Sequence, residues 1–240
     1  MTGKVAIITG GSQGIGAGLA AAYRAQGWAV AASAHAIMPS QGPDLLTVAA
    51  DITEPASGTL IIDAALERFG RIDTLVNNVG AFISKPFTDY TAEDYALIVG
   101  VNLTGFFWLT QRAIAEMATR YGGHVVNITA TLAESAESGA PAALTALTRG
   151  GLAAVTRSLA VEYASYGIRV NAVSPGVIQT PLDPPESCDD LGDRLPPLGR
   201  AGQVSDVVDA VLYLESSCVT GKILPIDGGP NAPNRRTGGH

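Results

Sequence analysis

Residues 4–16 read KVAIITGGSQGIG, and this stretch decides the fold. Val5–Ile8 form a short apolar run, which is typical of a strand buried on both faces of a sheet. The glycine-rich residues Thr9–Gly16 then lead into a helix that we expect to begin near Gly14, because glycine accepts positive φ and lets a ligand approach the backbone. The free N–H groups and the dipole of a helix N-terminus favour a phosphate. Together these features predict a dinucleotide-type site, with an ordinary tight turn as the alternative.

The composition is that of a compact globular protein. The chain has 240 residues, of which 47% are hydrophobic and 15% are charged. No linker divides it, so we expect one Rossmann-type domain over residues 1–228, followed by a loose tail over 229–240. The formal net charge of −7 argues against nucleic acid and anionic membranes as partners, because both attract basic surfaces.

Cysteine and histidine usage indicates a reduced compartment and no metal. Two cysteines, Cys188 and Cys218, are too few for a disulfide framework. The three histidines (His35, His124 and His240) have no carboxylate or thiol neighbour at metal-ligand spacing. No signal peptide precedes the first strand, and no apolar run approaches membrane-spanning length. We therefore expect a soluble, cytoplasmic protein.

Strand and helix patterns alternate along the rest of the chain. We predict strands at 28–33, 45–50, 72–76, 124–129, 168–174 and 222–226, and helices over 17–25, 55–69, 92–121, 143–166 and 204–214. The run 92–121 is one long helix or two helices joined near Gly100–Asn102. The segment Ala34–Asp44 is too short, and too broken by proline and glycine, for a full helix. This alternation predicts an α/β fold with a doubly wound parallel sheet and helices on both faces.

Several motifs, taken in their order and spacing, resemble those of the short-chain dehydrogenase/reductase family across nearly the whole chain. Thr9–Gly16 matches the family's TGxxxGxG, and Asn77–Gly80 (NNVG) is similar to its NNAG. Asn171–Gly176 with Thr180 resembles its N-x-x-x-P-G…T segment. The resemblance implies a Rossmann-like fold, NAD or NADP as cofactor, and a small-molecule substrate. It also implies a homodimer or homotetramer, formed through the helices at 104–121 and 143–166.

The resemblance assigns the cofactor site to several separate parts of the chain. In the family, the glycine turn holds the phosphates, an acid after the third strand lies beside the adenine, and the N-x-x-x-P-G…T segment borders the nicotinamide. The candidate cofactor-binding residues are Gly10, Ser12, Gln13, Gly14, Ile15, Gly16, His35, Asp51, Ile52, Asn78, Val79, Gly80, Arg149, Pro175, Gly176, Val177, Ile178 and Thr180.

The catalytic signature is where this chain departs from the family. The family has a serine after the fifth strand and YxxxK on the next helix. Counting from the neighbouring motifs places Ala130 at the serine position, Thr145 at the tyrosine position and Arg149 at the lysine position. No tyrosine lies between residues 121 and 163, and the three lysines of the chain all lie elsewhere, so a shifted alignment does not restore the pair. Asn102 falls at the family's active-site asparagine.

These replacements remove the usual acid–base chemistry. A threonine hydroxyl does not ionise usefully at neutral pH, so Thr145 does not replace a tyrosine. Arg149 keeps a fork of donors for the ribose but stays protonated. Loss of positioned acid–base catalysis typically costs about 10²–10⁴ in rate. Thr145 and Arg149 are thus either a repurposed site or an ordinary helix face, and Thr129 or Thr131 would supply a hydroxyl only if the loop turned it inward.

The choice between NAD and NADP stays open, with NADP favoured. No acidic residue occurs from Ala17 to Pro43, where NAD-binding folds usually carry an acid for the ribose 2′-hydroxyl. Its absence removes a charge that would repel a 2′-phosphate. However, Gln13 stands where a basic residue would help to bind that phosphate, and His35 is mostly neutral near pH 7.

Two functions fit this sequence. Phe82, Ile83, Leu132, Val177 and Ile178 predict a mostly apolar pocket, and Glu134 and Glu137 lie on a loop beside it. The leading hypothesis is an NAD(P)-binding oxidoreductase with a non-classical active site that acts on a small apolar substrate. The alternative is a catalytically inactive protein that binds a dinucleotide or another ligand and acts as a partner or sensor.

Overall fold

The computed structural model describes residues 3–40, 42–133, 141–180 and 196–229. Its main feature is a seven-stranded sheet in the order β3-β2-β1-β4-β5-β6-β9, in which every neighbouring pair is parallel. The strands are β1 (Val5–Thr9), β2 (Ala29–Ala34), β3 (Leu45–Ala49), β4 (Thr74–Asn77), β5 (Gly123–Ile128), β6 (Ile168–Pro175) and β9 (Ile223–Ile226). This arrangement confirms the predicted doubly wound α/β fold.

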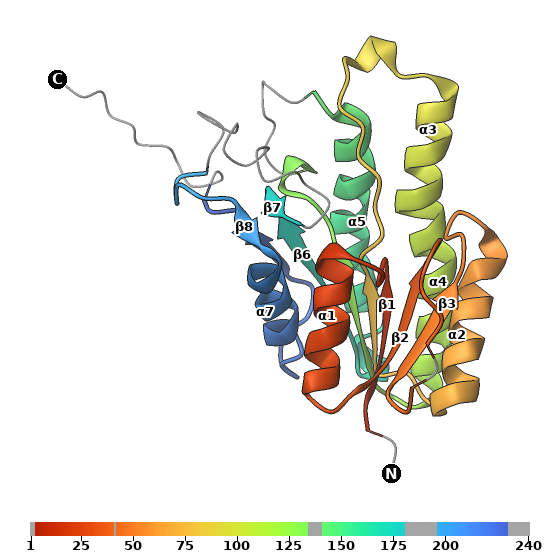
Figure 1. Ribbon diagram of the computed structural model, residues 1–240. Coiled ribbons are helices and arrows are strands. Elements are labelled where there is room, and N and C mark those ends of the chain that lie inside the picture. The colour runs from red at the N-terminus through yellow and green to blue at the C-terminus, as the bar shows by residue number, and fades with distance from the viewer. Residues whose placement is uncertain (1–2, 41, 134–140, 181–195, 230–240) are drawn as a thin grey trace.

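Helices cover both faces of the sheet (Figure 1). On one face lie α1 (Gly14–Ala25) and α7 (Val204–Leu214), and on the other lie α2 (Pro55–Phe69), α4 (Gly105–Thr119) and α5 (Ala143–Glu162). Alternate residues of β1 feed the two cores: Val5 and Ile7 join the α2 and α4 side, whereas Ala6 and Ile8 join the α1 and α7 side. Because both faces are covered, the central strand is apolar throughout.

The ends of two helices agree with the predicted ranges. Both α2 and α7 span the predicted residues, 55–69 and 204–214. Pro55 occupies the first turn of α2, and Gly70 ends that helix with a φ of 76°, which are the positions that proline and glycine favour. Most strand ends differ from the predicted ones by a residue or two. Between β2 and β3, the described residues form no helix, as predicted.

The long helical run contains a π-helical segment at the predicted join. α3 (Ala92–Val99) continues through π-helical residues Gly100–Thr104 into α4. By length and composition alone, the stretch Ala92–Thr119 is able to cross a membrane, which corrects the expectation that no run approaches that length. In this fold, however, α4 packs on the sheet through Leu109 and Met117, as the core helix of a globular domain does.

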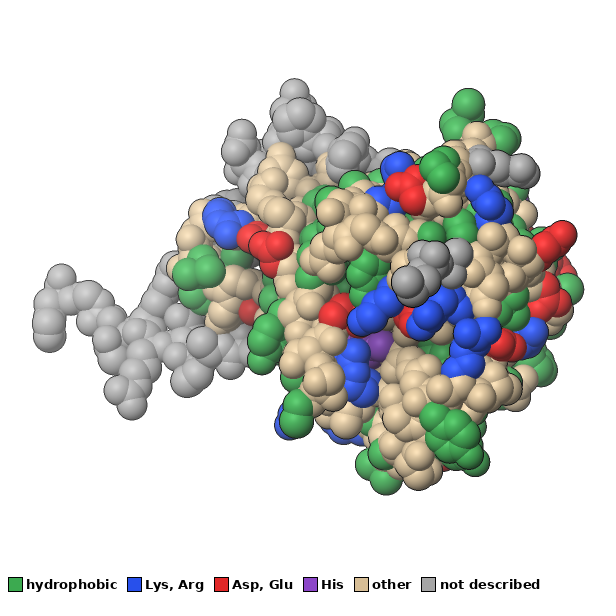
Figure 2. Space-filling view, turned by 90° about the horizontal axis from the view of Figure 1, so that it is seen from below, with side chains coloured by type: hydrophobic (Ala, Val, Ile, Leu, Met, Phe, Trp, Pro, Cys, Tyr) green, Lys and Arg blue, Asp and Glu red, His purple; other side chains and the backbone are tan. Residues whose placement is uncertain are grey.

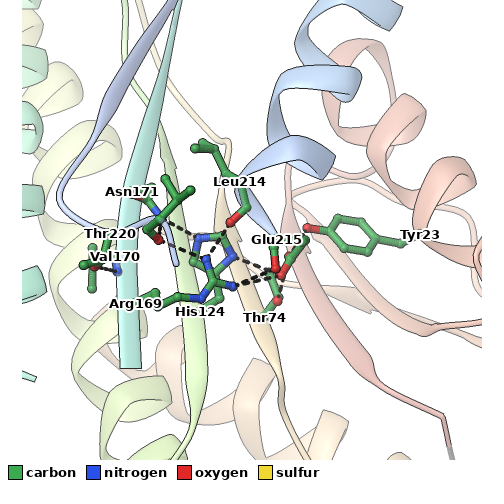
Figure 3. Close-up of polar contacts among 10 residues, drawn as sticks. Tyr23, Thr74, His124, Arg169, Val170, Asn171, Leu214, Glu215 and Thr220 are labelled. Atoms are coloured by element: carbon green, nitrogen blue, oxygen red, sulfur yellow. Dashed lines mark hydrogen bonds and ion pairs between the residues drawn. The ribbon is translucent and has the colours of Figure 1, made fainter. Parts of the chain in front are cut away.

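A polar network joins five elements at the edge of the sheet opposite the glycine turn (Figure 3). Glu215, which follows α7, accepts hydrogen bonds from the Tyr23 hydroxyl (2.6 Å) and the Thr74 hydroxyl (2.9 Å). Its other carboxylate oxygen lies 3.1 Å from Nδ1 of His124 and 3.3 Å from Nη2 of Arg169. Figure 2 looks at the molecule from this end and shows Lys and Arg side chains gathered near its centre.

The network makes folding stability sensitive to acid. Burial alone would raise the pKa of Glu215, but the contacts with His124, Tyr23 and Thr74 outweigh it and lower the pKa from 4.5 to about 2. The unfolded chain therefore binds a proton more readily at this carboxylate than the folded chain does. The resulting stabilisation is complete above the unfolded pKa and is lost as the pH falls toward the folded one.

We expect Glu215→Gln to lower the free energy of unfolding at pH 7 by about 2–3 kcal/mol, because it removes the charge that His124 and Arg169 face. The difference from the wild type should shrink between about pH 5 and pH 3, as the native carboxylate loses its advantage. Urea unfolding across this pH range measures both quantities. Glu67→Gln, at an exposed position of α2, is the matched control and should change neither. A difference that stays constant with pH would contradict this account of Glu215.

Candidate cofactor site and active site

The turn between β1 and α1 leaves a helix N-terminus open for a phosphate. Gly10 and Gly14 have φ values of 66° and 54°, in the region that favours glycine. A Cβ atom on Gly16 would lie 2.1 Å from the Gly10 carbonyl oxygen, so only glycine fits there. The side chain of Gln13, which precedes α1, caps none of the helix N–H groups. This geometry is the one that phosphate binding at the turn requires.

Thr9 ties this turn to the segment that follows β4. Its hydroxyl accepts hydrogen bonds from the backbone N–H groups of Asn78 (2.9 Å) and Val79 (3.1 Å). In return, the side-chain amide of Asn78 donates to the Thr9 carbonyl oxygen at 2.9 Å. A Cβ atom on Gly10 would lie 2.8 Å from that amide nitrogen. The two predicted cofactor segments are therefore one rigid unit.

The predicted adenosine-side residues meet at the carboxyl ends of β2 and β3. Asp51 accepts hydrogen bonds from the hydroxyl and the backbone N–H of Thr53, and these hydrogen bonds lower its pKa. Both Asp51 and His35 are exposed. A shallow depression of about 770 Å³ extends from Gly11 and Ser12 along α1. Arg24 lines it, but its guanidinium is paired with Asp44 at 2.9 Å.

The predicted nicotinamide-side residues lie across from the glycine turn. A Cβ atom on Gly14 would be in ordinary contact with Thr180, at 3.7 Å. Ile178 lies in a short strand, β7 (Ile178–Gln179), which pairs with β8 (Gly202–Gln203). Gly176 packs so closely on Asp227 that a Cβ atom there would lie 2.9 Å from the Asp227 Cα atom. The structure thus brings the segment 175–180 to the same edge of the sheet as the turn.

The side chain of Asn102 is fully occupied by other parts of the protein. It lies in the π-helical segment and is buried. Its Oδ1 accepts from the Ala81 N–H at 2.8 Å, and its Nδ2 donates to the Ala81 carbonyl and to the Thr148 hydroxyl, each at 3.1 Å. Asn102 therefore holds the segment after β4 in place, and its side-chain amide nitrogen already donates two hydrogen bonds within the protein.

Neither of the two threonines that flank Ala130 replaces the missing serine. The Thr129 hydroxyl donates to the Val173 carbonyl oxygen (3.2 Å), and the Thr131 hydroxyl donates to the Pro175 carbonyl oxygen (3.4 Å). Both threonines are buried. Their side chains thus point to β6, and the loop does not turn either of them inward.

Thr145 and Arg149 lie one helical turn apart on the buried face of α5. Thr145 is 2% exposed, and its hydroxyl has no hydrogen-bond partner among the described residues. Arg149 is 8% exposed and donates from Nη1 to the Ile128 carbonyl oxygen at 2.6 Å. Its Nη2 lies beside Gly80, where a Cβ atom would be only 1.3 Å away. Burial lowers the pKa of Arg149 to about 10, so the guanidinium stays charged at neutral pH.

The structure describes some of the other residues that were predicted to line the pocket. Phe82 and Val177 are 54% and 44% exposed and give the described rim an apolar character. Glu134 and Glu137 lie outside the described residues. Across the described ranges, no three His, Cys, Asp or Glu side chains are grouped so that they could hold a metal ion.

Two threonines support the site in ways that the sequence alone did not reveal. Thr9 was part of a matched motif, but its partners are about 70 residues away, so no local pattern indicated the contact. Thr148 contacts Asn102 across 46 residues and lies on the same face of α5 as Thr145 and Arg149. Its three-residue spacing from Thr145 is the one signal that could have found it.

Comparison with known proteins gives consistent matches over nearly the full length. A family model described as enoyl-(acyl carrier protein) reductase matches residues 10–231. Oxidoreductase UcpA of Escherichia coli K12 is 33% identical, with 97% of this chain and 96% of that protein covered. The 3-ketoacyl-(acyl-carrier-protein) reductase of Brucella melitensis complexed with NADH is 31% identical, with a TM-score of 0.86 and coverage of 95% and 98%. ElxO with NADP bound is 27% identical, with a TM-score of 0.85 and the same coverage.

We expect Thr9→Val, which keeps the shape of the side chain, to cost about 1–3 kcal/mol in unfolding free energy, because the N–H groups of Asn78 and Val79 lose their acceptor. Thermal and urea unfolding measure this loss. Thr88→Val is the control, since the Thr88 hydroxyl is exposed and, among the described residues, bonds only to Asp89. Equal stability of Thr9→Val and Thr88→Val would show that Thr9 does not tie β1 to β4.

Proposed function

Because this chain belongs to the short-chain dehydrogenase/reductase family, we propose that it is an NAD(P)-dependent oxidoreductase in which Thr145 and Arg149 replace the usual tyrosine and lysine. The observation that carries this proposal is the complete phosphate-binding turn, with its uncapped α1 N-terminus and its link from Thr9 to Asn78. A turn of this kind is the part of the fold that a dinucleotide needs. NADH and NADP bound to two structural relatives support either nucleotide.

The nucleotide, when bound, supplies or accepts the hydride. The chain itself supplies a fixed positive charge at Arg149, which the Ile128 carbonyl oxygen orients. Such a charge would stabilise negative charge on a substrate oxygen without transferring a proton. The proton would then come from water, because Thr145 has no base beside it among the described residues. Carbonyl substrates that need little acid assistance suit this site.

The substrate that we propose is small and largely apolar, in keeping with the exposed Phe82 and Val177. The alternative is a dinucleotide- or ligand-binding protein without catalysis. It is favoured by the absence of a free acid–base group at positions 130 and 145, and by the full engagement of Asn102. The two proposals differ in turnover, and both require the nucleotide to bind.

A titration with NADH and NADPH tests the proposed function. We expect one of them to bind with a dissociation constant in the micromolar range, seen in cofactor fluorescence and in calorimetry. A panel of aldehydes, ketones and imines, screened with the better nucleotide, should then show oxidation of the cofactor by at least one compound. Binding without any turnover would favour the non-catalytic alternative. No binding of either nucleotide at millimolar concentration would overturn both.

We further propose a homodimer or homotetramer built on α4 and α5. Phe107 and Trp108 are 52% and 40% exposed and line an apolar depression of about 400 Å³ that also includes Leu152 and Val155 of α5. A contiguous exposed apolar patch of this kind commonly marks a protein contact.

We expect the purified protein to sediment as a dimer or a tetramer, and Phe107→Asp to shift it toward the monomer. Phe87→Asp is the control, because Phe87 is 74% exposed but lies outside this depression. Sedimentation velocity measures the mass of each variant. A wild-type protein that remains a monomer at high concentration would contradict the proposed assembly.

A further inference from the structure

The guanidinium of Arg149 is a buried cation that lacks a counter-ion in the described chain. Six other arginines pair with a carboxylate: Arg24, Arg71, Arg112, Arg120, Arg169 and Arg200. Arg68 and Arg157 are exposed, so water solvates their charge. Arg149 is 8% exposed, and its one hydrogen bond within the described ranges goes to the neutral carbonyl of Ile128. Burial of an unpaired charge is costly, which points to a missing anionic partner.

The phosphates of a bound cofactor are not the missing partner of Arg149, because they would bind at a different part of the site. The phosphate-binding turn is formed by β1 and α1, whereas Arg149 lies between the end of β5, at Ile128, and Gly80 after β4. If the proposed function holds, Arg149 therefore faces the reacting end of the cofactor and the substrate.

The surroundings of Arg149 include polar groups that the described residues leave unused. Gly80 is exposed, and its missing side chain is what leaves room for Nη2 of Arg149. Nε and Nη2 of Arg149 make no hydrogen bond with the described residues. One turn earlier on α5, the buried Thr145 hydroxyl also lacks a partner. A planar guanidinium with two nitrogen atoms free to donate matches the two oxygens of a carboxylate.

We propose that the substrate of this site carries a carboxylate, which Arg149 binds with its fork of donors and Thr145 with its hydroxyl. This inference rests on the proposed function, to which it adds a substrate class: a carbonyl or imine compound with an apolar body and a carboxylate group. The exposed Phe82 and Val177 would contact the apolar body. For such a substrate the charge of Arg149 is taken up by the carboxylate, so Arg149 positions the substrate, and the proton for the reacting group still comes from water.

The experiment compares hexanoate with hexanamide, which have the same apolar chain and differ in charge. Calorimetry would measure the binding of each to the full-length protein, alone and with saturating NADPH or NADH. We expect hexanoate to bind at least about tenfold more tightly than hexanamide, and Arg149→Met to remove this preference. Arg149→Lys should keep part of it, because one charge remains without the fork. Arg157→Met, on the exposed face of α5, is the matched control and should keep all of it.

Stability provides a readout that does not depend on any ligand. If Arg149 has no counter-ion, Arg149→Met should unfold at the same temperature as the wild type or at a higher one. A marked fall would mean that a carboxylate elsewhere in the chain already neutralises Arg149, and it would overturn the proposal. Equal binding of hexanoate and hexanamide by the wild type would overturn it too. If the protein binds a nucleotide but does not prefer hexanoate to hexanamide, the proposed function stands and the carboxylate proposal fails. If it prefers hexanoate but binds no nucleotide, the proposed function fails.

Discussion

The hydrogen bonds between Thr9 and the segment after β4 are the interaction on which this site depends. Neighbouring parallel strands leave their last backbone groups unpaired at the same edge of the sheet. Here the Thr9 hydroxyl accepts two of these N–H groups, and the Asn78 amide returns a hydrogen bond to the Thr9 carbonyl. Since these groups are satisfied within the protein, the free N–H groups of α1 are the ones that a ligand meets.

The two halves of the site differ in how completely their polar groups are satisfied. Around the glycine turn and Asn102, side-chain amides and hydroxyls have partners at 2.8 to 3.1 Å. On the buried face of α5 and nearby β6, by contrast, the hydroxyls of Thr145 and Ser174 have none among the described residues, and Arg149 has one neutral acceptor. Buried polar groups are rarely left unpaired. The first half is thus a rigid frame, and the second is where a ligand would supply the missing contacts.

Local patterns in the sequence were sufficient for the fold because each element carries its own signal. The apolar run Val5–Ile8 required cover on both faces, and Pro55 and Gly70 marked the ends of α2. Contacts between distant residues had no such signal. His124 and Glu215 are 91 positions apart, and nothing near either of them indicated that they would meet beneath the sheet at 3.1 Å. The motifs also predicted that the cofactor segments meet at one edge of the sheet. Each of these segments follows a strand, and parallel strands all end at the same edge.

The arginine at position 149 shows what an alignment of motifs leaves out. The spacing indicated that a lysine had become an arginine, but both residues are cationic and both can reach a ribose. The difference lies in geometry: the longer, planar group extends to Gly80 and occupies the space that a side chain there would fill. Gly80 is part of the NNVG motif, where glycine would otherwise be explained by the backbone alone. In this chain it also makes room for a buried charge, so positions 80 and 149 constrain each other. A side chain at position 80 would force the guanidinium out of the site, and a shorter cation at position 149 would leave an empty space beside Gly80.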